Sequence, residues 1–141
     1  MTPTRLLLLP LFLHVLLIVI VGVVTLRARI KSVRSRETRL RDISLDTGAW
    51  PNRVRQLGNN FDNQFDLPML WYSCCALLLG TGLVDWIAVA LSWLFLVSRI
   101  VHTLVHTGSN YVPTRMRVFV AGFGMVIAMW AWFGLRLFVI G

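Results

Sequence analysis

The sequence predicts an all-α integral membrane protein, a single four-transmembrane-helix bundle that occupies residues 1–141. Of the 141 residues, 57% are hydrophobic and only 14% are charged, and the mean hydropathy is +0.71. A soluble domain of this size buries only about 60 to 70% of its surface, so this chain would lack the polar residues to cover its exterior. Disorder requires low hydropathy, and two adjacent cysteines cannot form a disulfide framework. The surrounding medium is therefore expected to be lipid.

The first transmembrane helix is expected within residues 5–41. A nearly continuous apolar run extends from Leu6 to Leu26, and about 20 such residues span the hydrocarbon core of a bilayer. A cleaved signal peptide is the alternative, but the run is too long for its apolar region and no small-residue cleavage site precedes Arg27. The basic stretch that begins at Arg27 is expected to carry this helix into water.

The second helix is expected over residues 51–82, after a loop over residues 42–50. Turn-forming residues end the loop, and Pro51 suits the first turn of a helix because its missing N–H would be unpaired there anyway. The helix begins in polar sequence and becomes apolar toward its end.

The third and fourth helices are separated from their neighbours by turn residues. Asp85 is the only charge between Leu67 and Ser98, a stretch too long for one span, so two glycines and Asp85 mark a tight hairpin. The third helix is expected over residues 85–107. A loop over residues 108–112 follows, and the last helix is expected over residues 112–139.

The basic residues indicate how the bundle is oriented. Nine of the fourteen Lys and Arg residues lie from Arg27 to Arg55, and Arg115 and Arg117 flank the second connection. Lys and Arg concentrate in cytoplasmic loops, so we expect both connections in the cytoplasm and both termini in the periplasm of a bacterial inner membrane. This placement explains most of the net charge of +8, argues against nucleic-acid binding, and favours anionic lipid as the partner of the basic segment.

Polar residues inside the expected spans are the candidate functional residues, because they are expensive to bury in lipid. Two sets each share one helical face: Arg55, Asn59, Asn63 and Asp66 on the second helix, and Arg99, His102 and His106 on the third. Counted from the hairpin, Asp66 lies roughly 28 Å and His102 roughly 25 Å along the two arms. The two sets are therefore expected to meet in the cytoplasmic half of the membrane, within reach of Arg115.

Two interpretations of this cluster stay open. In the first, Asp66 pairs with Arg99 or His102 only to let the helices assemble. In the second, the cluster is an anion-binding pocket that opens to the cytoplasm, because its arginines outnumber Asp62 and Asp66. A metal site is not expected, since no Cys or carboxylate lies beside His102 and His106 at metal-ligand spacing.

Two motifs carry a family resemblance, and the second of them comprises two stretches of sequence. Residues 63–72 read NQFDLPMLWY, and residues 98–103 and 110–115 read SRIVHT and NYVPTR. These segments resemble the second-helix and third-helix motifs of the MAPEG family, the membrane-associated proteins in eicosanoid and glutathione metabolism. They are most similar to the microsomal prostaglandin E synthase branch and its bacterial relatives. With the four-helix pattern, the resemblance covers nearly the whole chain.

The resemblance implies a homotrimer that binds glutathione at three sites between neighbouring subunits, with transferase or peroxidase activity on lipophilic small molecules. It assigns Arg115 as the catalytic residue, which stabilises the glutathione thiolate. It assigns Asn63 and Asp66 to the polar groups of the tripeptide. The full set of expected ligand-binding residues is Asn59, Asn63, Asp66, Arg99, His102, His106 and Arg117.

The chain also departs from the family pattern. Asn59 and Asp62 stand where glutathione-using members carry arginines, Asp66 is shorter than the usual glutamate, and His106 replaces a tyrosine. The loss of two cations and the gain of a carboxylate work against binding of the glutathione carboxylates. The alternative function is a non-catalytic membrane scaffold or accessory subunit, in which the polar cluster supports only trimer assembly. A transporter is less favoured, because neither broken spans nor internal repeats are expected.

Overall fold

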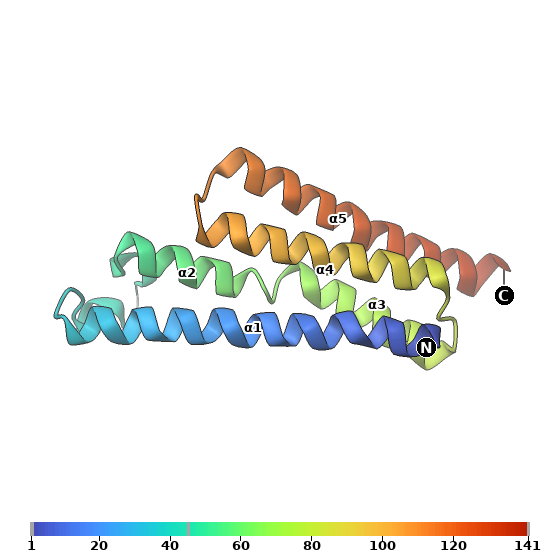
Figure 1. Ribbon diagram of the computed structural model, residues 1–141, viewed down its shortest axis with the longest axis horizontal. Helices are drawn as coiled ribbons and strands as arrows, with labels where there is room; N and C mark the ends of the chain where they lie inside the picture. Colours follow the sequence, from blue (N-terminus) through green and yellow to red (C-terminus); the bar gives the residue numbers. More distant parts are fainter. Residues whose placement is uncertain (1, 45, 141) are drawn as a thin grey trace.

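The computed structural model describes residues 2–44 and 46–140, and these residues form helices, turns and loops without a strand. The helices are α1 (Pro3–Arg34), η1 (Leu40–Ile43), η2 (Thr47–Ala49), α2 (Asn52–Asp62), α3 (Leu67–Thr81), α4 (Trp86–Thr107), α5 (Val112–Leu135) and the π-helical segment η3 (Arg136–Ile140). Because α3 continues along the line of α2, the chain forms four rods, and both ends of the chain lie at the same end of the bundle (Figure 1). The expectation of an all-α chain with four helical rods is confirmed.

The first helix ends earlier than the sequence suggested. It was expected to continue to residue 41, but α1 ends at Arg34. Arg36 adopts a left-handed φ of 60°, and the amide N–H groups of Glu37 and Thr38 donate to the carbonyl of Ser32 at 3.1 and 3.3 Å. The chain therefore folds back over its own last turn, which satisfies a carbonyl that continuation of the helix would have satisfied.

The second predicted helix is broken, so the expectation of one continuous helix over residues 51–82 is wrong. α2 ends at Asp62 and α3 begins at Leu67. Pro68 explains the break: inside a continuous helix it would leave the carbonyl of Gln64 without a donor and its ring would clash there. In the first turn of α3 the same proline is well tolerated.

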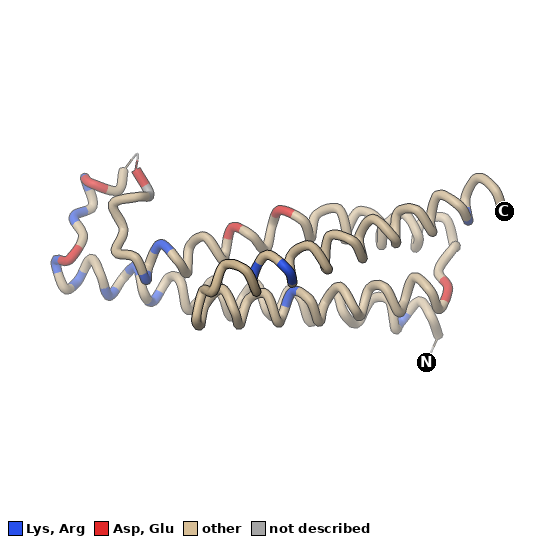
Figure 2. The backbone as a smooth tube through the Cα atoms, turned by 90° about the horizontal axis from the view of Figure 1, so that it is seen from above, with Lys and Arg blue, Asp and Glu red and all other residues tan. Residues whose placement is uncertain are grey.

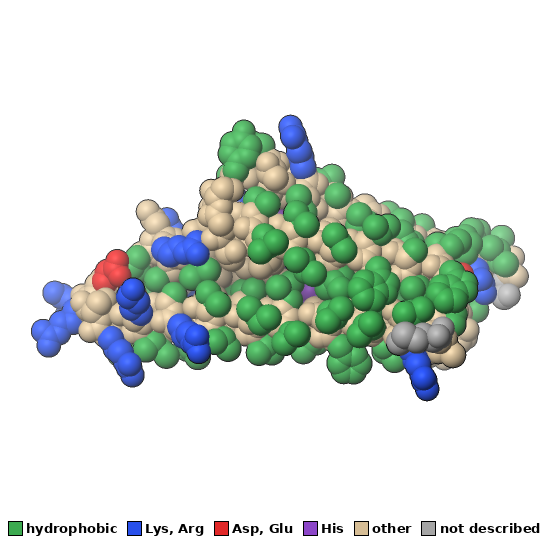
Figure 3. All heavy atoms as spheres, viewed as in Figure 1, with side chains coloured by type: hydrophobic (Ala, Val, Ile, Leu, Met, Phe, Trp, Pro, Cys, Tyr) green, Lys and Arg blue, Asp and Glu red, His purple; other side chains and the backbone are tan. Residues whose placement is uncertain are grey.

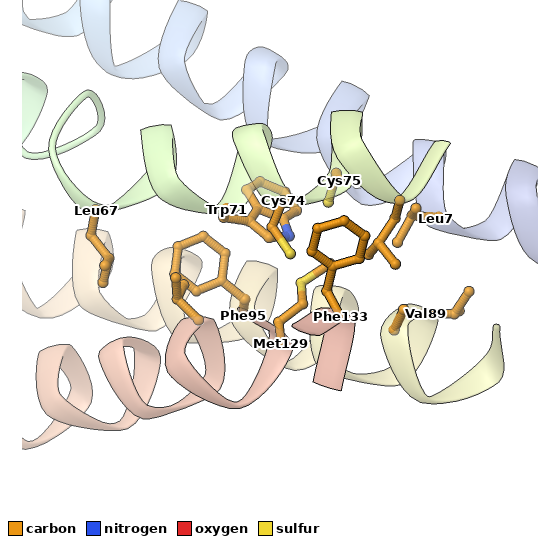
Figure 4. Packing of buried hydrophobic residues seen from close by; sticks show 12 residues of the cluster. Leu7, Leu67, Trp71, Cys74, Cys75, Val89, Phe95, Met129 and Phe133 are labelled. Atoms are coloured by element: carbon orange, nitrogen blue, oxygen red, sulfur yellow. The ribbon is translucent and has the colours of Figure 1, made fainter. Parts of the chain in front are cut away.

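An apolar core lies between α1, α3, α4 and α5 (Figure 4). It includes Leu7, Trp71, Cys74, Cys75, Leu78, Phe95, Met129 and Phe133. The indole of Trp71 is fully buried, and its N–H donates to Ser92 Oγ at 3.1 Å. Both cysteines are free thiols that pack in this core. The larger cluster of buried polar residues lies further along the bundle, on α2 and the second half of α4.

Three helices are long and apolar enough to cross a membrane: Pro3–Arg34, Trp86–Thr107 and the continuous Val112–Ile140. α3 has only 15 residues, so the second rod reaches a comparable length only together with α2. Apolar side chains cover the visible face of the bundle along most of its length (Figure 3). Lys and Arg gather mainly at the end formed by the α1–α2 connection (Figure 2). This distribution is that of a membrane-spanning bundle with one strongly basic end.

Asp85 fastens the opposite end. The chain turns at Gly82, which has a left-handed φ of 71°, and one Asp85 carboxylate oxygen accepts from the N–H of Ala88 at 2.9 Å, which caps α4. The other oxygen accepts from the Trp132 indole at 2.8 Å and pairs with Arg136 at 3.0 Å. One side chain therefore joins the α3–α4 hairpin to the end of α5.

Replacement of Asp85 with alanine should lower the free energy of unfolding by about 1 to 3 kcal/mol, because both the helix cap and the partner of a half-buried arginine are lost. Thermal unfolding in detergent measures this change. Asp42→Ala is the matched control, since its exposed pair with Arg41 is expected to contribute less than about 1 kcal/mol. Equal unfolding temperatures for the two variants would contradict the fastening role of Asp85.

Candidate functional site

The polar face of α4 is turned into the bundle. Arg99, His102 and His106 are 2%, 3% and 3% exposed, and the two imidazole rings lie 5.6 Å apart between centroids. α4 packs against α1, α2 and α5, so a residue on its inner faces is enclosed by protein. The spacing of three and four residues thus places the guanidinium of Arg99 and the imidazoles of His102 and His106 in one buried row.

Arg115 enters this row from the first turn of α5. Its Nη1 atom donates to Asn110 Oδ1 at 2.7 Å and lies 3.3 Å from His106 Nε2. Asn110 holds a left-handed φ of 51°, which asparagine tolerates better than most residues, and its N–H donates to the Val105 carbonyl at 2.8 Å. The connection between α4 and α5 therefore orients the guanidinium of Arg115. In the sequence, Asn110 was a turn residue and a member of the family motif, and its contact with Arg115 was not predicted.

Two side chains of α2 hold the last turn of α4. The amide of Gln56 donates to the carbonyl of His106 at 2.6 Å, and Arg53 donates to the carbonyl of Thr107 and to Gln56 Oε1. The last carbonyls of a helix have no partners within the helix, and basic side chains commonly satisfy them. Sequence analysis missed both residues, because it followed the face of α2 that carries Arg55. A basic residue that can reach a helix C-terminus was the available signal.

Two hollows meet at Arg115. The smaller one has a volume of about 190 Å³ and is lined by Asn63, His102, Val112, Arg115, Met116 and Phe119. The larger one has a volume of about 440 Å³ and is lined by Asn52, Arg53, Arg55, Gln56, Asn59, His106, Asn110 and Arg115. In the described part of the chain, no Asp or Glu lines either hollow. The larger hollow therefore suits an anion, and the smaller one combines a cation with an apolar wall.

The carboxylates lie outside this arrangement. Asp62 and Asp66 are exposed, and among the described residues neither forms an ion pair. Arg99 instead donates from Nη2 to the carbonyl of Asn63 at 2.8 Å. The expected pairing of Asp66 with Arg99 or His102 is therefore absent among the described residues of the chain.

The other predicted residues divide in the same way. Asn59 is exposed but lines the larger hollow, and Asn63 is half-buried and lines the smaller one. Arg117 is exposed on α5 and lines neither hollow. Of the eight residues predicted for the site, Asp66 and Arg117 are thus the two that the protomer turns outward.

A second polar layer, next to the first, was not predicted. Gln64, in the break between α2 and α3, donates to the Asn60 carbonyl at 2.9 Å and to Thr103 Oγ1 at 3.2 Å. Further toward the core, His14 and Tyr72 form a hydrogen bond of 2.8 Å. Several buried atoms of residues 2–44 and 46–140 have no hydrogen-bond partner here: His14 Nε2, Asn60 Nδ2, Gln64 Oε1, Arg99 Nε, His102 Nδ1 and His106 Nδ1. Neutral amides gave little signal in the sequence, although Asn60 and Gln64 share a helical spacing.

The fold and the site together define an integral membrane protein with a polar, mainly cationic pocket at one end of a helical bundle. The chain belongs to the MAPEG family, whose model matches residues 7–135, nearly the whole chain. Comparison with curated proteins and with solved structures gave no match.

Two substitutions at Asn110 separate its two contributions. Asn110→Gly keeps the left-handed backbone and removes the contact with Arg115, whereas Asn110→Ala removes the contact and also forces a Cβ into that conformation. The alanine variant should therefore be less stable than the glycine variant by about 1 kcal/mol, measured by denaturant unfolding in detergent. If the two variants unfold at the same denaturant concentration, the left-handed turn is not a constraint on this connection.

Proposed function

We propose that the protein is a homotrimer in a bacterial inner membrane that binds glutathione or a similar anionic ligand in a cytoplasm-facing pocket between subunits. Arg115 then supports a transferase or peroxidase reaction on lipophilic substrates. The observation that carries the proposal is the position of Arg115 at the junction of a polar, cation-lined hollow and a partly apolar one. Membership of the MAPEG family supports the same reading.

The residues of the larger hollow fit the charged groups of glutathione. Asn59 occupies a position where glutathione-using relatives are expected to carry a cation, but Arg53 and Arg55 line the same hollow from neighbouring positions on α2. Their guanidinium groups are suited to carboxylates, which they bind in a bidentate fashion. This chain lacks cations at the family's positions, but Arg55 lies about one turn and Arg53 almost two turns before Asn59 on the same helix.

Arg115 is placed to act on the sulfur. Glutathione would contribute a thiol, which is a nucleophile only as its thiolate. The Arg115 guanidinium is held by Asn110 and lies beside His106, so it offers a fixed positive charge to an anion in the hollow. A preorganised charge of this kind favours the thiolate and stabilises negative charge that develops during reaction.

The smaller hollow supplies an apolar side to the site. Val112, Met116 and Phe119 of α5 line it, and Val112 and Met116 are more than half exposed on the outer surface of the protomer. A lipophilic molecule that enters from the bilayer or from a subunit interface would therefore meet Arg115 from this side. This supports lipophilic substrates over soluble ones.

The trimer is supported by the exposed carboxylates. Asp66 lies three residues from Asn63, whose carbonyl binds the buried Arg99, so the two residues are at most about 10 Å apart. A carboxylate exposed to lipid close to that depth would be costly. A neighbouring subunit that covers Asp66 would remove this cost.

Binding of glutathione is tested by thermal unfolding of the detergent-purified protein with and without millimolar reduced glutathione. A ligand that binds only the folded state stabilises it by about 2.7 kcal/mol at one hundred times its dissociation constant. We expect an upward shift that Arg115→Ala abolishes. Arg117→Ala is the matched control, because it removes the same charge two residues away from a side chain that lines neither hollow.

The same experiment discriminates the alternative. If saturating glutathione leaves the unfolding temperature of the wild-type protein unchanged, glutathione is not the ligand. The result then favours the scaffold or accessory-subunit function, or a pocket that Asn59, Asp62 and His106 have retuned for another ligand. If the shift occurs and both arginine variants lose it equally, binding depends on the general charge of this end and not on Arg115.

The subunit interface is tested by Asp66→Ala. If a neighbouring subunit covers this carboxylate and pairs with it, the variant should dissociate at a higher protein concentration than the wild type, as measured by native mass spectrometry in detergent. Asp42→Ala, which removes an exposed carboxylate in the connection between α1 and α2, should leave the oligomer unchanged. A monomeric wild-type protein would refute the trimer itself.

A further inference from the structure

A groove lies at the basic end of α1, away from the candidate site. It has a volume of about 390 Å³ and is lined by Arg29, Ile30, Val33, Arg34, Leu40, Ile43 and Trp50. Its walls come from the last turns of α1, from η1 and from Trp50, which lies two residues before the start of α2. Five of its seven lining residues are apolar, and both of the polar ones are arginines. The groove is thus mainly apolar, and its two arginines give it positive charge.

One of these arginines is held in a fixed place. The guanidinium carbon of Arg29 lies 5.6 Å from the ring centroid of Trp50, within range of a cation–π interaction. A Cβ atom on Gly58 of α2 would lie only 3.1 Å from Arg29 Nη2, so the absence of a side chain at Gly58 makes room for this group. Arg29 Nε is buried and has no hydrogen-bond partner in the described part of the chain.

The charge around the groove is not neutralised by the protein. Arg27 and Lys31 line an adjacent hollow that shares Ile30 and Arg34 with the groove. Among the residues that the structure describes, none of these basic side chains forms an ion pair. The groove is therefore complementary to a ligand that carries negative charge.

The position of the groove along α1 indicates where that ligand lies. The apolar run of α1 ends at Leu26, and about 20 residues cross the hydrocarbon core. Arg29 and Arg34 are then roughly 5 and 12 Å beyond the edge of the core. This is the layer that contains lipid phosphates, and the apolar lining residues Ile30 and Val33 lie in it on the same helix.

We propose that this groove binds one anionic diacyl phospholipid, with its phosphate on Arg29 and Arg34 and part of an acyl chain along Leu40, Ile43 and Trp50. The inference rests on the proposed placement of the basic end at the cytoplasmic surface, and it does not depend on glutathione binding. It sharpens a general attraction to anionic lipid into one site with a defined headgroup and chain contact. Zwitterionic lipid lacks the net charge that the arginines select.

The headgroup contact is tested by native mass spectrometry of the delipidated protein, titrated with dioleoyl phosphatidylglycerol or dioleoyl phosphatidylcholine. Phosphatidylglycerol should bind more tightly. A Lys or Arg near the membrane surface contributes enough attraction that Arg34→Gln should weaken this binding about fivefold. Arg39→Gln removes the same charge from an exposed side chain outside the groove, so it should change the affinity much less.

The chain contact is tested by Leu40→Ser, which should weaken phosphatidylglycerol binding and leave binding of the soluble, chain-free headgroup unchanged. Equal affinity for the two lipids, equal losses in Arg34→Gln and Arg39→Gln, or chain-free headgroup that binds as tightly as the lipid would each overturn the proposal. Stabilisation by glutathione, measured on Arg34→Gln, should equal that of the wild type. Failure of the lipid site and failure of the glutathione site are therefore seen separately.

Discussion

The architecture depends on the contact between Arg99 and the carbonyl of Asn63. A buried arginine in a membrane bundle requires acceptors, and a helix that is interrupted in the same place has carbonyls without donors. Pro68 interrupts the second rod, and Arg99 lies opposite the interruption on α4. The guanidinium of Arg99 therefore donates to the carbonyl of Asn63, which has no donor within the helix. Asn63 is thereby held beside His102, and Gln64 is turned inward toward Thr103. The hydrogen bond between Arg99 and the Asn63 carbonyl therefore helps to set the positions of Asn63 and Gln64 beside α4.

A second consequence is the division of the bundle into two halves. The half near the chain ends is packed mainly with Trp71, Phe95 and other large apolar groups. The other half contains the buried polar row of α4 and the hollows around Arg115. Apolar packing fixes the helices on one side of the polar residues. On the other side, Gln56 donates to the His106 carbonyl, and Asn110 accepts a hydrogen bond from Arg115. A pocket can remain open there because the surrounding helices are fixed elsewhere.

Much of the fold was accessible from the sequence, because the bilayer imposes a length on apolar segments and the turn residues divide them. The four rods and the tight turn before Asp85 required only these two rules. The break at residues 63–66 was not predicted, although Pro68 signalled it, because the helical spacing of Arg55, Asn59, Asn63 and Asp66 favoured one continuous helix. Helical spacing placed Arg99, His102 and His106 together correctly. It did not reveal that Asp66 is turned outward, since that depends on how the chain restarts after the break. Nor did it reveal the roles of Gln56 and Asn110, whose partners are backbone carbonyls and a side chain brought close only by the fold.

The fastening at Asp85 bears on the order in which the protein is made. α3 and α4 are separated by a four-residue turn, so we expect them to enter the membrane as one hairpin. At that stage the second carboxylate oxygen of Asp85 has no partner, because Trp132 and Arg136 have not yet left the ribosome. The turn of the hairpin can therefore form first, but the contacts of Asp85 with Trp132 and Arg136 require the last helix. We expect insertion of α5 to be the step that joins this end of the bundle.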